Sequence, residues 1–193
     1  MNRLQEYYKN AILQDLCTKY KEMWKSATDK EQLVRLALMQ QSIPHWLTFA
    51  YNKQGLTKDY VENEFQDYIN EKYTAIDVDG VTGNYKTNLY IGFKAILKPM
   101  SDILVLAWAN MPLVQIKPTM ATKIYVGCKS NVNIQPQGYN TITLMMFDES
   151  KVTIDECDNT NDITIYKYSN DAWVETDKFC LANIKTFNKK LKI

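Results

Sequence analysis

A repeat of about twenty residues in the C-terminal half constrains the fold of this chain most strongly. The segment KSNVNI at residues 129–134 returns as ESKVTI at 149–154 and, more loosely, as SNDAWV at 169–174. A second alternating apolar segment precedes each of these copies, at residues 124–126, 142–146 and 163–166. Two β-type segments in each short period predict a β-solenoid, because a coil of this length cannot bury its own apolar face and must stack on its neighbours.

Alternate side chains of a strand point to opposite faces of a sheet, so the repeat predicts which residues fill the interior. In the second strand of each coil, the residues expected to point inward are Val114, Ile116, Val132, Ile134, Val152, Ile154, Ala172 and Val174. In the first strand, they are Ile103, Val105, Ala107, Ile124, Val126, Ile142, Leu144, Met146, Ile163 and Ile165. The outward residues of the second strand are largely polar, as Gln115, Asn133 and Thr153 show.

The outward residues of the first strand are apolar as well, and a wall that is apolar on both sides needs a cover. These outward residues are Leu104, Leu106, Trp108, Tyr125, Met145, Phe147, Tyr166 and Tyr168. One interpretation is that the N-terminal helices lie across the wall. The other is that the wall is a docking surface for another protein or for a further copy of the chain. The candidate binding residues are Tyr125, Met145, Phe147, Tyr166 and Tyr168.

The N-terminal part predicts four helices. Apolar residues at four-residue steps, from Leu4 to Trp24, indicate a helix over residues 2–26. Thr28 and Glu31 form a capping box for a second helix. A third helix is expected from Pro44 to a stop at Gly55, and a fourth over residues 57–73. The resulting division is a helical domain at 1–73, a junction at 74–100 and a solenoid domain at 101–193.

The junction combines turn residues at 77–80 and 82–84 with a strand expected at 89–97. The chain is therefore expected to be an α+β protein, with an N-terminal helical domain packed on a small C-terminal β-solenoid. An antiparallel β-sandwich remains the alternative for the C-terminal domain, because Gly138 and residues 158–161 also suit hairpin loops.

The charge balance excludes a strong global field. The 23 basic and 22 acidic residues give a formal net charge of +1, which argues against nucleic acid as a partner. The helix expected after Gly55 carries more acids than bases, so it would repel DNA as a recognition helix. The first residues lack the apolar core of a signal peptide, and no run of about eighteen apolar residues occurs. We therefore expect a cytoplasmic protein without membrane partners.

The sequence contains no motif that commits it to a chemistry, and we expect no cofactor and no metal. His45 is the only histidine, and a structural role is the favoured interpretation. Cys17, Cys128, Cys157 and Cys180 are widely spaced, which favours reduced, buried thiols over a zinc site. Acidic residues gather near expected corners of the solenoid, at Asp148, Glu149, Asp155, Glu156 and Asp158. Paired carboxylates can hydrolyse polysaccharides, so a carbohydrate-active enzyme that uses Asp155, Glu156 and Asp158 is an alternative hypothesis.

The layout as a whole resembles a group of uncharacterised proteins encoded by phages and prophages of gut Bacteroidales. The residues that carry this resemblance are Leu16 and Cys17, residues 21–24, residues 55–61, Phe65, residues 68–70, and the coil at 131–134. The resemblance implies a helical N-terminal region, a C-terminal stack of short β coils and a mobile-element setting, either in the host cytoplasm or in the virion. It implies no biochemical activity.

The hypothesis that follows is a non-enzymatic binding or assembly protein whose partner is another protein or its own copies. Its working surface is a solenoid face or the aromatic helix around Trp46 and Tyr51. Besides the carbohydrate-active enzyme, a second alternative is a small-ligand or nucleic-acid-binding protein that counteracts host defence.

Overall fold

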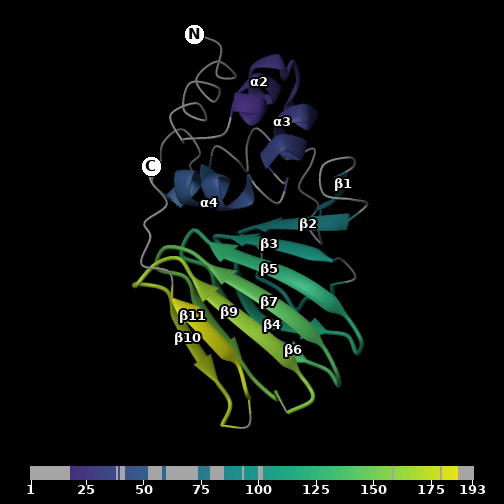
Figure 1. Cartoon of the computed structure of the whole chain (residues 1–193), viewed down its shortest axis with the longest axis vertical. Coiled ribbons are helices and arrows are strands. Elements are labelled where there is room, and N and C mark those ends of the chain that lie inside the picture. Colours follow the sequence, from purple (N-terminus) through teal and green to yellow (C-terminus); the bar gives the residue numbers. More distant parts are fainter. Residues whose placement is uncertain are drawn as a thin grey trace.

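The fold is a β-solenoid with helices at one end (Figure 1). This computed structural model describes residues 18–37, 39, 42–51, 58–59, 74–78, 85–92, 94–99, 102–157, 159–178 and 180–186. The helices are α2 (Thr18–Ser26), α3 (Lys30–Ala37) and α4 (Ile43–Tyr51). The strands are β1 (Thr74–Val78), β2 (Tyr85–Ile91), β3 (Ile103–Ala107), β4 (Asn110–Ile116), β5 (Ala121–Gly127), β6 (Asn131–Pro136), β7 (Thr141–Met146), β8 (Lys151–Ile154), β9 (Asp162–Lys167), β10 (Trp173–Thr176) and β11 (Asn183–Thr186).

Successive strands alternate between two sheets. The seven-stranded sheet A has the order β1-β2-β3-β5-β7-β9-β11, and the four-stranded sheet B has the order β10-β8-β6-β4. From β2 onward every described pairing is parallel, and only β1 joins antiparallel to β2. A chain that returns to the same sheet in parallel after each coil is a solenoid. The solenoid prediction is confirmed, and the antiparallel β-sandwich is excluded for this region.

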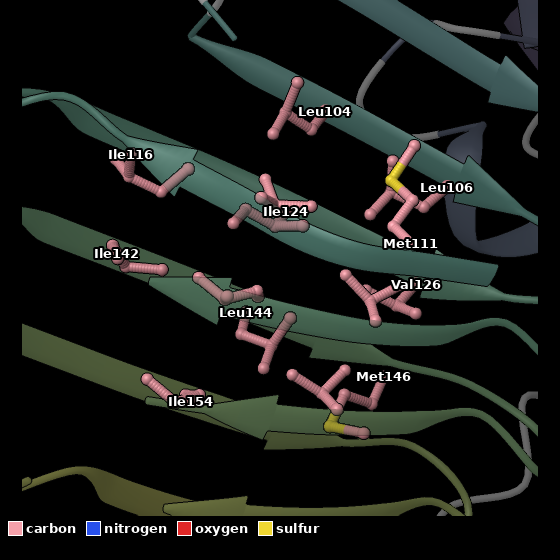
Figure 2. Packing of buried hydrophobic residues seen from close by; sticks show 14 of the residues in the cluster. Leu104, Leu106, Met111, Ile116, Ile124, Val126, Ile142, Leu144, Met146 and Ile154 are labelled. Atoms are coloured by element: carbon pink, nitrogen blue, oxygen red, sulfur yellow. The ribbon is translucent and has the colours of Figure 1, made fainter. Parts of the chain in front are cut away.

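The interior consists of straight columns of aliphatic side chains between the two sheets. One column in sheet A contains Leu104, Ile124, Leu144, Ile165 and Ile184 in directly paired positions. A column in sheet B contains Met111, Val132, Val152 and Val174. Figure 2 shows side chains from both sheets meeting between the ribbons. Except for Val174 and Ile184 in the last coil, all of these side chains are buried.

The predicted orientation of β3 is wrong by one residue. Ile103, Val105 and Ala107 were expected to point inward, but the pairing of Leu104 with Ile124 and of Leu106 with Val126 turns the leucines into the core. The five residues of β3 are all apolar and all buried. Alternation therefore contains no signal in this strand, and only its pairing with β5 fixes the register.

The strand expected at 89–97 is also displaced. Strand β2 ends at Ile91, and Gly92 follows with a φ of 62°. Leu97 forms only a single bridge to Val114. The turn expected at residues 77–80 begins as a strand, because β1 extends to Val78.

Left-handed backbone at the corners of the solenoid occurs mainly at residues other than glycine. Those with positive φ are Trp108, Thr119, Cys128, Lys129, Asp148 and Glu156. The left-handed conformation costs such residues on the order of 1 kcal/mol each, so the corners need compensating contacts. Asp148 supplies them at one corner, because its carboxylate accepts hydrogen bonds from the backbone N–H groups of Cys128 (2.5 Å) and Lys129 (2.9 Å) one coil earlier. Asp177 accepts in the same way from Glu156 N–H.

Buried polar residues also stack at the corners. Ser130 is fully buried, and its Oγ accepts from Ala109 N–H (3.0 Å) and donates to the Gly127 carbonyl (2.6 Å). At the other corner, Asn140 is fully buried, accepts from Met120 N–H (3.3 Å) and donates to the Gln137 carbonyl (3.1 Å). These side chains replace the turn hydrogen bonds that glycine-rich corners would make through backbone alone.

The helices agree with the prediction in part. The second helix begins one residue later than expected, because Asp29, rather than Thr28, accepts from Gln32 N–H (2.8 Å). Helix α2 falls within the expected first helix, and α4 begins at Ile43, immediately before Pro44. The start of the first helix and most of the fourth, over residues 57–73, lie outside the described residues. Only residues 58–59 of that fourth helix are seen, and they are helical.

Candidate functional site

Three of the five candidate residues lie side by side on the outer face of sheet A. Tyr125 on β5 pairs directly with Met145 on β7, which pairs with Tyr166 on β9. The same column continues to Val105 on one side and to Lys185 on the other. Because paired residues of a parallel sheet point to the same face, these side chains form one continuous row along the solenoid. We call Tyr125, Met145, Phe147, Tyr166 and Tyr168 the aromatic row.

The other two members extend the row toward the corner where the strands of sheet A end. Phe147 directly follows β7, and its N–H donates to the Val126 carbonyl. The ring of Phe147 stacks on the ring of Tyr168, with centroids 5.0 Å apart and planes inclined by 6°. Such stacking contributes about 0.5–1.5 kcal/mol beyond the burial of the rings, so it fixes both side chains in place.

Burial falls along the row from the first coils to the last. Tyr125 and Phe147 are 3% and 2% exposed, whereas Met145, Tyr166 and Tyr168 are partly exposed. Figure 1 shows the same polarity, with the helices gathered at the β2 end of the stack and β9 and β11 farther away. The outer apolar wall is therefore buried at one end and partly open at the other.

Helix α4 covers part of this wall next to the row. It contacts β5, and Leu47, itself fully buried, lies so close to Gly127 that a Cβ on that glycine would sit 3.1 Å from the Leu47 Cβ. The Cys128 thiol donates to the Leu47 carbonyl at 3.5 Å. Helix α4 thus covers the end of β5, where a glycine makes room for it, and a wider cover of the wall by N-terminal helices stays a prediction.

The phenols of the row are in a poorly solvated environment. Burial, with a smaller contribution from Tyr168, raises the pKa of Tyr125 to about 12. Burial, followed by the proximity of Tyr166, also raises the pKa of Tyr168. Lys185 lies with its ammonium 5.4 Å from the centre of the Tyr166 ring, within the range of a cation–π contact. The Tyr125 and Tyr168 phenols therefore stay uncharged at neutral pH, and Lys185 places a cation at the open end of the row.

Two of the acidic residues near the corners, Asp148 and Asp155, accept hydrogen bonds from the preceding coil. Asp155 accepts from Asn133 Nδ2 (2.6 Å) on the outer face of sheet B. Asp148 caps the preceding corner and accepts from Ser150 Oγ (3.0 Å). Burial raises the pKa of Asp148 to about 6, against the opposing effect of the N–H donors at Lys129 and Cys128. Glu156 is exposed at a left-handed corner position, and Asp158 lies outside the described residues.

The described cysteines and His45 have surroundings that fit a structural rather than a catalytic role. Cys128, Cys157 and Cys180 are in no disulfide bond, the first two of them are buried, and Cys17 lies outside the described residues. Burial raises the pKa of Cys128 well above its ordinary value, with a further contribution from Asp148, so this thiol is a poor nucleophile. His45 lies in the first turn of α4 with its side chain partly buried.

The alternative surface around Trp46 and Tyr51 is described only by its backbone. Both residues belong to α4, and their side chains lie outside the described part of the structure.

Sequence reasoning missed two features of this region. The site at Gly127 where α4 packs has only a weak signal in the sequence: a glycine stands at the position where the neighbouring coils have Ala107 and Phe147. Leu181 and Ile184 are the second feature, because they are exposed at the last coil although their residue types suggested a core. Periodicity identifies the column of Ile184 but does not reveal that this side chain is exposed.

Comparison with known proteins adds no relative: no protein-family model matches the chain, and no curated protein or solved structure shows significant similarity to it. Among the described residues, no group of three or more His, Cys, Asp or Glu side chains is placed to hold a metal ion. No helix in the described part combines the length and hydropathy needed to cross a membrane.

Proposed function

We propose that this chain is a non-enzymatic binding or assembly protein that acts through protein–protein contacts on the outer face of sheet A. The observation that carries the proposal is the aromatic row, which continues past the region buried near α4 and becomes partly exposed at Met145, Tyr166 and Tyr168. Aromatic residues and methionine are enriched in protein interfaces, where they supply large contact areas at low entropic cost.

The rigidity of the row supports the same function. Tyr125, Met145 and Tyr166 are held by parallel pairing to the neighbouring coils, and Phe147 and Tyr168 are held by the stacking of their rings. A surface that is already ordered loses little conformational freedom on binding, which favours affinity. Lys185 at the open end adds a cation that would favour a partner with an acidic group beside its apolar contact.

A pair of charged substitutions tests this proposal. Met145→Glu and Tyr166→Glu place two carboxylates on the partly exposed part of the row, and we expect the chain to stay folded while binding of its protein partner is lost. Thr153→Glu together with Asn131→Glu is the matched control, because these residues are partly exposed and exposed on the polar outer face of sheet B. Equal binding by both double variants would refute the role of the row, and unfolding of the first would mean that the row is interior.

The biological setting proposed is a phage or another mobile element, with the protein in the host cytoplasm or in the virion. The support for it is the sequence resemblance given above. The genes that flank this one, together with a search for the protein in purified particles, test the setting. Neighbouring genes of ordinary metabolism and no particle association would count against it.

A further inference from the structure

Two cysteines meet at the corners that lead from sheet B back to sheet A. Cys157 follows β8 and Cys180 follows β10, and these two strands pair in parallel. Asp177 N–H donates to the Ile154 carbonyl (3.1 Å), so the pairing continues past the ends of the strands. Glu156 N–H donates to the Asp177 carboxylate. These contacts hold the corner with Cys180 against the corner with Cys157 in the preceding coil.

The side chains of the two cysteines are in direct contact. Cys157 is 4% exposed and belongs to the core, and Cys180 is partly exposed and packs against that core. Burial raises the pKa of Cys180, and the side-chain hydrogen bond from Cys157 is the largest effect that opposes this rise. The Cys157 thiol therefore lies within hydrogen-bond reach of the Cys180 sulfur, and no disulfide joins them.

The third described cysteine has a different neighbour. Cys128 follows β5, and its thiol donates to the Leu47 carbonyl of α4 (3.5 Å). Among the cysteines that the structure describes, Cys157 and Cys180 are therefore the two that form a thiol pair.

We propose that Cys157 and Cys180 are a redox-active pair, which a small disulfide such as oxidised glutathione converts into an intramolecular disulfide bond. The Cys180 thiolate attacks one sulfur of the small disulfide, forms a mixed disulfide and releases one small thiol. Cys157 then attacks the Cys180 sulfur and releases the second small thiol. The protein thiols lose two electrons and two protons, and the small disulfide gains both as it becomes two thiols.

The geometry suits a disulfide with little strain. Paired parallel strands lie about 4.8 Å apart, and disulfides join Cα atoms about 4.4–6.8 Å apart. Sulfur atoms already in hydrogen-bond contact reach the S–S bond length of about 2 Å by rotation of their side chains. The bond would therefore form between two neighbouring coils without separating their strands.

The disulfide would act as a redox-sensitive lock on the coil that contains β10. No residue of β10 or β11 is buried, whereas every strand from β3 to β9 contains buried residues. Segments with few buried side chains open locally most easily. A bond between Cys157 and Cys180 closes a loop that contains β9 and β10, so it restricts the opened chain and disfavours opening.

Mapping the disulfide in the full-length protein tests the pairing. The protein is equilibrated in glutathione buffers of increasing oxidised fraction, alkylated and digested with trypsin. Cys157 and Cys180 lie on separate tryptic peptides, 152–167 and 179–185, so their disulfide gives one distinct joined product. We expect this product to form at a ratio of oxidised to reduced glutathione at least tenfold lower in the folded protein than in urea, because the fold holds the thiols together. A disulfide that forms no more readily in the folded protein, or one that links other cysteines, overturns the proposal.

Single substitutions test the order of the two steps. Cys157→Ser should stop the reaction at a mixed disulfide between glutathione and Cys180, whereas Cys180→Ser should block it at the first step, because Cys157 is buried. Cys128→Ala is the matched control, which removes a buried thiol from another corner and should leave the disulfide unchanged. Loss of the disulfide in Cys128→Ala together with its persistence in Cys157→Ser contradicts the assignment.

Amide hydrogen exchange tests the lock. Oxidation should slow exchange in β10 at least tenfold in the natural protein, because the disulfide disfavours opening of this coil. Exchange in β5, which lies outside the closed loop, should stay unchanged, and Cys157→Ser should show no slowing at all. Equal exchange in β10 before and after oxidation overturns the lock. These measurements involve no binding partner, so they are independent of the function proposed for the aromatic row.

Discussion

The packing of α4 against sheet A can be tested with the substitution Gly127→Ala, which adds a single carbon atom, the Cβ. Gly127 ends β5, and the added Cβ would lie 3.1 Å from the Leu47 Cβ and 3.1 and 3.2 Å from its two methyl carbons. Contacts this short require a side chain or the helix to move. The backbone itself accepts alanine, because Gly127 does not have the positive φ seen at Gly92 and Gly138.

Two contributions to the free energy of unfolding, the gain from alanine in a strand and the cost of overpacking, have opposite signs. The sign of the measured change therefore tests the packing of α4 on Gly127. Replacing a glycine in a strand by alanine stabilises the fold by about 0.5–1 kcal/mol when nothing opposes the methyl group. Overpacking a filled interior costs about 1–3 kcal/mol. With α4 seated on Gly127, we therefore expect a net loss of about 1–2 kcal/mol in the free energy of unfolding. Without it, we expect a gain.

Urea unfolding of the two proteins followed by circular dichroism measures this difference. Gly127→Ala in a Leu47→Ala background provides the control: that background removes the two methyl contacts but keeps the Cβ of residue 47, so the glycine substitution should be less harmful there than in the natural protein. An unfolding midpoint for Gly127→Ala at or above that of the natural protein would refute the packing of α4 on β5.

Three further predictions concern the corners of the solenoid. The pKa of Asp148 rises on folding from 3.8 to about 6, so protonation favours the folded state. The free energy of unfolding should therefore fall as the pH rises from about 4 through about 6. Asp148→Asn should remove that part of the pH dependence, which urea titrations at several pH values measure. Ser130→Ala leaves the buried Ala109 N–H without its acceptor and should lower the free energy of unfolding by about 1–3 kcal/mol, which the same titration detects. In the native protein, iodoacetamide should modify Cys180 before Cys128, because the latter is buried and has the more strongly raised pKa; mass spectrometry of the labelled chain checks this order.

Much of the solenoid follows from sequence because its coils are nearly identical environments. In the first halves of β7 and β9, polar and apolar residues alternate, so the inward positions of Leu144 and Ile165 are predictable from one strand at a time. In β3, both faces are covered, and the run of apolar residues contains no information on orientation. The strands differ because the outer face of β3 is covered as well as its inner face. The sequence of a single strand does not show which of its faces are covered in the tertiary fold.

The corners illustrate a second limit. The chain has only six glycines, and the left-handed positions at Cys128, Lys129 and Glu156 are stabilised by acidic side chains about twenty residues later. Asp148 and Asp177 therefore hold the backbone of a neighbouring coil, a role that sequence reasoning did not assign to the corner acids. Spacing between an acid and a corner in the preceding coil is the signal that could have revealed it.

The aromatic row was predictable as a row but not in its burial. The pairing of Tyr125, Met145 and Tyr166 follows from the repeat. That Tyr125 is buried while Tyr166 is partly exposed depends on how far the cover over β5 extends, and this is a property of the tertiary fold.

Native mass spectrometry of the protein gently isolated from the cells that make it tests the central claim most directly, namely that the aromatic row is a protein-binding surface. We predict a stoichiometric complex that persists in the Thr153→Glu and Asn131→Glu control and disappears in the Met145→Glu and Tyr166→Glu double variant. A natural protein that carries no partner, or a complex that survives the double variant intact, would contradict it.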